Sequence, residues 1–177
     1  INQHILWITS VGKNGNRLNL SGYDLRQLVD LRLYTLTALI AEKATFLNLN
    51  LNGIQLQSAV LTESDFRDCN LSRADLRAAV FDRANLSRAN LIGSNLGPLH
   101  FGKPTDPNHK IKPVSMIKAN LRYAQLSAAN LSDINLSEAD LSYANLSHAN
   151  LTNAKMDGAI LTETKLDGTI LDPLHKK

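Results

Sequence analysis

The sequence repeats with a period of five residues over most of its length. In steps of five from Phe46 to Phe101, all twelve positions hold Leu or Phe, and a second series from Met116 to Leu171 holds Leu or Met at all twelve. A period of five matches neither the 3.6 residues of a helical turn nor the two-residue alternation of a strand. The chain must therefore turn once in every repeat, which predicts a coil with corners.

The other positions of the repeat also have a fixed character. Two residues before each apolar centre the residue is usually small, most often Ala, and Cys69 occupies one of these positions. We expect both the centre and the small residue to face inward. The three remaining positions are mostly polar, with Asn or Asp before many centres and Ser or Thr after them. We expect these polar positions to face water.

Three segments, Ala-Asn-Leu-Ser-Arg (84–88), Ala-Asn-Leu-Ser-Asp (129–133) and Ala-Asp-Leu-Ser-Tyr (139–143), resemble the repeats of the pentapeptide repeat family. The resemblance implies an all-β solenoid, a right-handed quadrilateral β-helix with four repeats per coil and the central Leu or Phe on the axis. Coils of 20 residues would stack three aromatic pairs: Phe46 with Phe66, Phe81 with Phe101, and Tyr123 with Tyr143.

The two ends of the predicted rod differ. An axis lined with Leu is open at both ends and needs caps. Isoleucines at helical spacing within residues 1–8, followed by glycines, predict a short capping helix in an amino-terminal unit of residues 1–17. We expect the β-helix over 18–172 and a tail over 173–177. The carboxyl end lacks a comparable cap, so it either pairs with a second copy or has lost a cap.

Two segments break the period. Residues 26–45 contain one extra residue and large side chains at positions for small ones, which predicts a distorted coil or, less favoured, a helical turn over 37–43. Between Phe101 and Met116, three prolines and a glycine predict a loop insertion at about 102–113. These two centres are 15 residues apart instead of five, so ten residues would be additional to the repeat.

Composition excludes several classes of function. The 19 Lys and Arg exceed the 16 Asp and Glu by only +3, so we expect no direct nucleic-acid binding. Cys69 is the one cysteine, which rules out an internal disulfide and a multi-cysteine metal cluster. No apolar run reaches the roughly 18 residues of a membrane span. No targeting segment is visible near Ile1, and we expect a cytoplasmic protein.

Residue types that catalysis requires occur mainly where the repeat already explains them. Ser recurs after the centres and Asp before them, and no single set of Ser, His and Asp stands apart. No phosphate-binding loop or dinucleotide fingerprint is present. His100, Asp106 and His109 have no recognised metal-ligand spacing. We therefore predict no catalytic residue, no cofactor and no metal, and a non-catalytic binding or structural scaffold whose partner is another protein.

Candidate partner-binding residues lie in the two least uniform parts of the surface. The predicted loop is basic and either docks an acidic partner or is simply solvated. The tyrosines 20 residues apart either anchor an interface or form an ordinary pair between coils. The candidate set is Lys103, His109, Lys110, Lys112, Tyr123 and Tyr143.

The resemblance also implies an alternative function. Family members that protect type II topoisomerases such as DNA gyrase from quinolones are understood to imitate DNA with an acidic surface. Residues 119–172 hold seven acidic and three basic side chains, a net charge of −4, and a homodimer through the C-terminal coil would double this surface. The basic loop and the basic tail oppose this interpretation, because the summed field of the molecule governs long-range steering.

Overall fold

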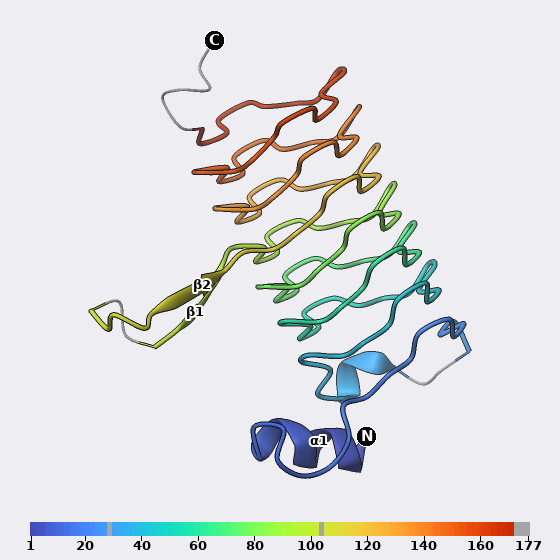
Figure 1. Ribbon diagram of the computed structural model, residues 1–177. Coiled ribbons are helices and arrows are strands. Elements are labelled where there is room, and N and C mark those ends of the chain that lie inside the picture. Colours follow the sequence, from blue (N-terminus) through green and yellow to red (C-terminus); the bar gives the residue numbers. More distant parts are fainter. Residues whose placement is uncertain (28–29, 103–104, 172–177) are drawn as a thin grey trace.

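The computed structural model describes residues 1–27, 30–102 and 105–171. Stacked coils form a rod, with helix α1 (Asn2–Thr9) at its amino-terminal end and a hairpin of strands β1 (Leu99–Phe101) and β2 (Lys110–Lys112) projecting from its side (Figure 1). A 3-10 helix, Leu31–Leu33, lies in the first coil. In the part of the chain that the structure describes, no helix is long and apolar enough to span a membrane.

Parallel backbone bridges join residues that are 20 positions apart, as in the series Asn50, Asn70 and Asn90. The chain therefore completes one coil in four repeats, and four columns of bridges run along the rod. The Leu51 N–H donates to the Asn70 carbonyl at 2.8 Å, and the Asn70 N–H donates to the Leu49 carbonyl at 3.0 Å. The Leu71 N–H in turn donates to the Asn90 carbonyl of the following coil at 2.7 Å, so an inner coil is hydrogen-bonded through its backbone to the coil on either side.

The apolar centres fill the axis of the rod, as predicted. From Phe46 to Leu151, every centre except Phe101 has at most 2% of its surface exposed. Small residues such as Ala59 and Ala74 are equally buried beside them. The rings of Phe46 and Phe66 stack with centroids 4.2 Å apart. Burial of each such apolar side chain contributes about 1.5–3 kcal/mol to the stability of the fold.

Each corner is a turn formed by the two residues after an apolar centre. In the repeat of Leu51, the Ile54 N–H donates to the Leu51 carbonyl at 3.1 Å, and Gly53 has a φ of 70°. A residue with a Cβ pays roughly 1–2 kcal/mol for this left-handed conformation. Most repeats nevertheless hold such a residue, for example Arg73 with a φ of 57°. The ladder enforces the strained conformation, since the Arg73 N–H donates to the Ile92 carbonyl in the next coil at 3.0 Å.

Where Asn or Asp precedes a centre, its side chain accepts a hydrogen bond from the following turn. The Oδ1 atom of Asn70 accepts the Ser72 N–H at 3.1 Å, and Asn145 accepts the Ser147 N–H in the same way at 3.0 Å. Both Asn side chains are half-buried. The prediction that these positions simply face water was incomplete, because the side chain replaces solvent as the partner of a turn N–H.

The structure corrects the predicted register at the interruption. Val80 bridges to Ser115, 35 residues later, so Met116 and not Phe101 follows Phe81 along the axis. The insertion therefore adds 15 residues, not ten. The predicted stack of Phe81 on Phe101 does not form; Phe81 packs edge-on against Phe66, with centroids 5.5 Å apart.

The physical reason for this early departure is Pro98. It is the second residue after Leu96, the position at which turns such as those of Gly53 and Arg73 have positive φ. The proline ring restricts φ to about −65°. The repeat therefore ends at Pro98 rather than at residue 102. Within the predicted loop, β2 pairs with β1 in antiparallel register.

The amino-terminal irregularities also take defined forms. Within residues 26–45 the described part forms a coil, with bridges at Ile40 and Thr45, and the only helical turn among those described residues is Leu31–Leu33 instead of 37–43. The predicted helix is present as α1. Buried His4 attaches it to the first coil, because its Nδ1 accepts the Leu18 N–H at 3.0 Å.

We predict that Leu131→Ala lowers the free energy of unfolding by about 2–5 kcal/mol, because it leaves a cavity on the filled axis. Leu33, with 74% of its surface exposed, supplies the matched control. Leu33→Ala should change the free energy by less than about 0.5 kcal/mol. Equilibrium urea unfolding measures both, and equal losses in the two variants would contradict the assignment of Leu131 to the axis.

Candidate protein-binding surfaces

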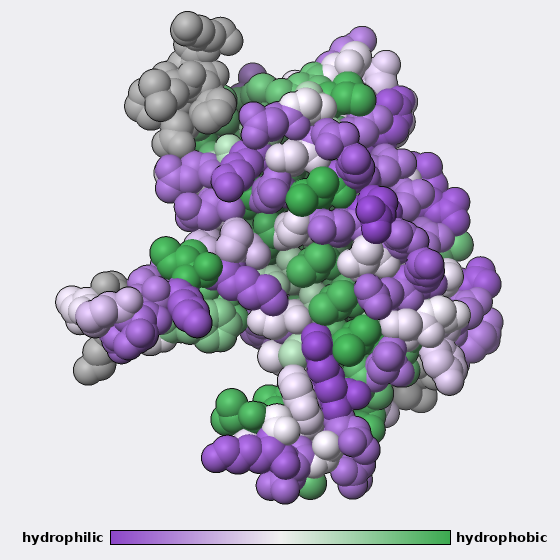
Figure 2. Space-filling view, in the orientation of Figure 1, coloured by the Kyte–Doolittle hydropathy of each residue, from purple (hydrophilic) through white to green (hydrophobic). Residues whose placement is uncertain are grey.

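The hairpin is the largest departure from the uniform rod. His100 pairs with Ile111 and Phe101 with Lys110. Phe101 and Ile111 are exposed by 47% and 53%, although both are large apolar side chains. Figure 2 shows apolar surface where the hairpin leaves the rod. Such side chains on a projecting segment are typical of a contact surface.

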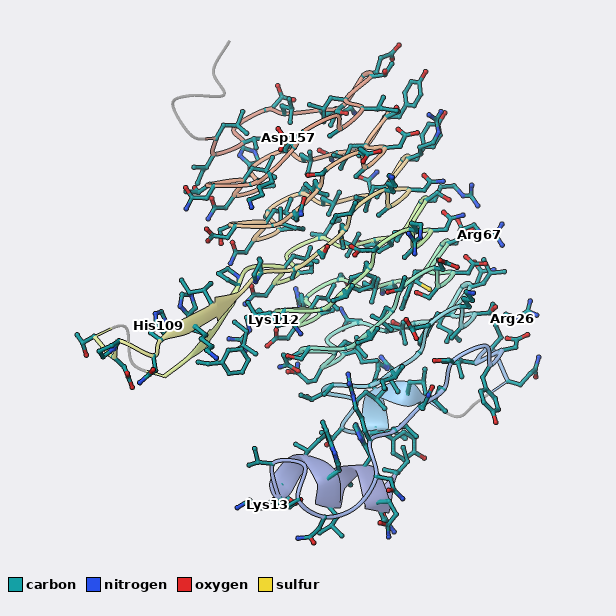
Figure 3. All side chains as sticks on the ribbon, in the orientation of Figure 1. Lys13, Arg26, Arg67, His109, Lys112 and Asp157 are labelled. Atoms are coloured by element: carbon teal, nitrogen blue, oxygen red, sulfur yellow. The ribbon has the colours of Figure 1, made fainter. Side chains whose placement is uncertain are left out.

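The hairpin divides the predicted basic cluster between its two faces. Residues opposite one another in an antiparallel pair share a face, and neighbours along a strand alternate. His100, His109 and Ile111 therefore lie on one face, whereas Phe101 lies on the other with Lys110 and Lys112. Figure 3 shows His109 farther from the rod than Lys112. The remaining loop candidate, Lys103, lies outside the described residues.

The lysines of β2 are not neutralised by the described part of the chain. Neither Lys110 nor Lys112 forms an ion pair with a described residue. Partial burial lowers the pKa of Lys112, and the positive charge of Arg17 acts in the same direction. The hairpin face that carries Phe101 is therefore both apolar and positively charged.

Tyr123 and Tyr143 form the expected stack on one corner, with ring centroids 4.9 Å apart and planes within 6°. The Arg122 guanidinium lies 5.6 Å and 5.4 Å from the two ring centroids and forms an ion pair with Asp140 at 3.2 Å. Both rings remain partly open to solvent. The pair is an ordered aromatic surface, held by stacking and by a cation–π contact.

The structure does not bring the tyrosine pair and the hairpin together. The Leu86 N–H donates to the Asn120 carbonyl, so Leu121 belongs to the column of Leu86. Tyr123, two residues after Leu121, lies at the corner of the same column. The hairpin leaves the rod after Leu96, which is two repeats, or half a coil, later. The two surfaces thus lie at opposite corners of the rod. Figure 3 shows this arrangement, because Arg67, which belongs to the tyrosine column, and His109 lie on opposite sides of the rod.

The acidic residues of the last coils do not form one continuous face. After the insertion, residues bridge to the next coil at a spacing of 20 positions, and no two acidic residues of 119–171 have that spacing. Glu138 and Asp157 share a corner, but Glu138 also pairs with Lys118 at 3.3 Å. Asp140 is paired with Arg122, and Asp133 accepts the Asn153 amide at 3.1 Å. The acidic surface required for DNA mimicry is therefore dispersed in the described region.

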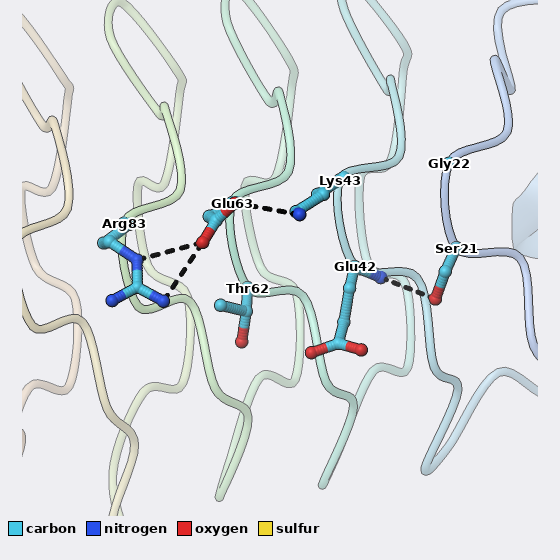
Figure 4. A pocket seen from close by; sticks show the side chains of 7 residues that line it. All are labelled: Ser21, Gly22, Glu42, Lys43, Thr62, Glu63 and Arg83. Atoms are coloured by element: carbon cyan, nitrogen blue, oxygen red, sulfur yellow. Dashed lines mark hydrogen bonds and ion pairs between the residues drawn. The ribbon is translucent and has the colours of Figure 1, made fainter.

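A hollow of about 460 Å³ on another corner was not predicted from the sequence. Glu63 lies between Lys43 and Arg83, with ion-pair distances of 3.6 Å and 3.0 Å (Figure 4). These three residues are 20 positions apart, so the coil length would have revealed the ladder. Their charges are satisfied by one another, and the Ser21 hydroxyl accepts the Glu42 N–H. The hollow thus presents a structural ion-pair ladder rather than an activated nucleophile.

Cys69 is unsuited to nucleophilic chemistry. Burial raises the pKa of its thiol to about 12, and the Sγ atom lies 2.9 Å from the Phe46 carbonyl, to which it donates. A thiol in this environment stays protonated and inert at neutral pH.

The geometry defines a four-sided parallel β-solenoid of five-residue repeats with two separate exposed surfaces. The chain belongs to the pentapeptide repeat family, whose model matches in eight copies over residues 42–77, 59–97, 119–158 and 134–172. Membership implies the right-handed quadrilateral β-helix, in agreement with the four columns of bridges.

The solved structures that match the chain include other pentapeptide repeat proteins. Full-length QnrB1, described as a plasmid-mediated fluoroquinolone resistance protein, is 23% identical, with 89% of this chain and 93% of that chain covered and a TM-score of 0.43. Rfr23 from the cyanobacterium Cyanothece 51142 is 20% identical, with 88% of each chain covered and a TM-score of 0.44.

HetL from Nostoc sp. strain PCC 7120, described as involved in heterocyst differentiation regulation, is 22% identical. The match covers 98% of this chain and 97% of that chain, with a TM-score of 0.33. No curated protein sequence matches the chain. These similarities transfer no activity to the chain.

Proposed function

We propose that this chain is a non-catalytic scaffold that binds another protein through the Phe101 face of its hairpin. The supporting observation is that the rod does not need the insertion. The Val80–Ser115 bridge continues the column across the 15 added residues, yet those residues expose Phe101. Beside it lie Lys110 and Lys112, which form no ion pair with a described residue. An exposed segment that adds nothing to the core is favoured for recognition.

The chemistry of this face indicates the kind of surface that it fits. A large aromatic side chain gains most when it enters an apolar pocket from which water is excluded. The surrounding lysines favour a partner with acidic residues at the rim, where complementary charge accelerates association and improves specificity. The tyrosine pair lies at the opposite corner and remains a candidate for a separate contact.

The five-residue register suggests a clean test of the hairpin. A variant that lacks residues 99–113 and carries Pro98→Gly joins Leu96 to Met116 with the spacing of a regular repeat. We expect a partner captured by the intact chain to be lost with this variant and to bind more weakly to Phe101→Ala. Affinity capture followed by mass spectrometry and a binding titration with the purified partner provide the measurement.

A second variant, Tyr123→Ala with Tyr143→Ala, distinguishes the two surfaces. If captured partners are lost only with this double variant, the tyrosine pair and not the hairpin is the binding surface. Identical partners and affinities for all variants would refute both surfaces. Circular dichroism should still show the folded solenoid in all three variants, since none of them removes an axial side chain.

We further propose that the carboxy-terminal coil pairs with a second copy of the chain. Leu161 and Leu166 occupy axial positions but are exposed by 39% and 38%, and Ile160 and Ile170 beside them are also exposed. The N–H groups of Leu161 and Leu166 have no backbone partner among the described residues, unlike the Leu141 N–H, which donates to Ile160. A second copy would cover apolar area and satisfy strand edges together.

Analytical ultracentrifugation tests this pairing. The unaltered chain should sediment as a concentration-dependent dimer, and Leu161→Glu with Leu166→Glu should sediment as a folded monomer because it places charge at the interface. Leu33→Glu is the matched control at an exposed leucine far from that end and should remain dimeric. A native chain that is monomeric at its highest soluble concentration would disprove the pairing.

Protection of a type II topoisomerase by DNA mimicry is the second candidate function. The dispersed acidic residues favour it less than the protein-binding scaffold. A gyrase supercoiling assay with and without a quinolone distinguishes the two functions. We expect neither inhibition nor drug protection by the intact chain. Protection that disappears when Asp133, Glu138 and Asp140 are replaced by their amides would instead establish DNA mimicry. The cytoplasmic location expected from the sequence stays a prediction.

A further inference from the structure

The second face of the hairpin carries two histidines in direct contact. The Nδ1 atom of His100 lies 3.2 Å from the Nε2 atom of His109, and the rings stack with centroids 5.3 Å apart and planes within 14°. His100 is exposed and His109 is half-buried. The contact is not used by the proposed protein-binding surface, since Phe101 and Lys110 face the other way.

Backbone pairing holds the two imidazoles together. His100 is opposite Ile111, and His109 lies two residues before Ile111 on the same strand side, so the histidines are diagonal neighbours on one face. The turn before His109 is also hydrogen-bonded, because the His109 N–H donates to the Asp106 carbonyl at 2.9 Å. The hairpin thereby holds two imidazole nitrogens at a fixed spacing before any metal ion binds.

The spacing of the two nitrogens matches a metal chelate. With Zn–N bonds of about 2.0–2.1 Å and tetrahedral angles, two imidazole nitrogens bound to one ion lie about 3.3 Å apart. The observed 3.2 Å therefore requires little movement other than turning the rings toward a common point. Without metal, one imidazole donates a hydrogen bond to the other, so both nitrogens are already in use as a donor and an acceptor.

The charges around this face permit a cation. The lysines of β2 lie on the opposite face, and no third His, Cys, Asp or Glu completes a ligand group among the described residues. Asp106 is an acidic residue of the same turn: its Oδ1 accepts the Asn108 N–H at 2.8 Å, and its Oδ2 is 3.9 Å from the position of a Cβ built on Gly102. Gly102 is next to His109 across the hairpin, since the same Cβ would lie 3.8 Å from the His109 Cα.

We propose that His100 and His109 form a two-histidine clamp for one divalent transition-metal ion. Imidazole ligands favour zinc, nickel and copper over magnesium and calcium. Two protein ligands leave the other coordination positions to water. Bound metal would cross-link β1 to β2 and so restrict the hairpin, an effect that does not depend on any partner protein.

Isothermal titration calorimetry with ZnCl₂ or NiCl₂ on the untagged full chain at neutral pH tests the clamp. We expect one ion per chain, and a loss of affinity of about tenfold or more in both His100→Ala and His109→Ala, since each removes one of two ligands. His148→Ala is the matched control, because His148 is an exposed histidine of the rod, and it should bind as the native chain does.

Two further measurements separate chelation from general effects of mutation. Binding should weaken in mildly acidic buffer, because protons compete for the imidazole nitrogens. Nuclear magnetic resonance should show metal-dependent shifts of the His100 and His109 rings but not of the His148 ring. Unchanged metal affinity in His109→Ala, or an equal loss of affinity in His148→Ala, would overturn the clamp. A double variant with His100→Ala and His109→Ala that binds metal as tightly as the native chain would also overturn it.

Discussion

The backbone ladder between residues 20 positions apart is the constraint on which the rest of this structure depends. It places every apolar centre above another on the axis and every turn above another at a corner. The Leu51–Asn70 and Asn70–Leu49 hydrogen bonds show the pattern, in which two neighbouring coils each donate to and accept from the other. Because every level is built alike, the rod has few places where a surface can be distinctive.

Distinctive surface arises in this molecule in two ways. In the first, side chains 20 positions apart form a ladder on one corner. Tyr123 and Tyr143 form such a ladder by stacking their rings. Lys43, Glu63 and Arg83 form another through ion pairs. In the second, the chain leaves the rod, as it does at Pro98. Ladders satisfy their own members, whereas the hairpin exposes apolar and charged groups that its own strands leave unpaired. This difference favours the hairpin as the recognition element.

Much of the fold was predictable because one side chain per repeat is dictated by the axis. The series of centres, the inward small residues and the tyrosine stack all follow from the period and the length of a coil. Phe101 was misassigned because it continues the series by spacing, while the decisive signal was Pro98, which cannot adopt the φ of its turn position. The His100–His109 contact was not predictable from spacing, since it depends on the hairpin register; the Lys43–Glu63–Arg83 ladder was predictable but overlooked.

The place at which the hairpin joins the rod has a further consequence for the chain entropy. Both ends of the insertion are held at neighbouring points of a rigid corner, so the closure of this loop is enforced by the coils on either side. For a loop closed in this way, each doubling of length costs only about 0.6 kcal/mol. The excursion can accordingly change in length and sequence almost independently of the scaffold, which makes this corner the position where the protein acquires new binding properties at least cost to its folding.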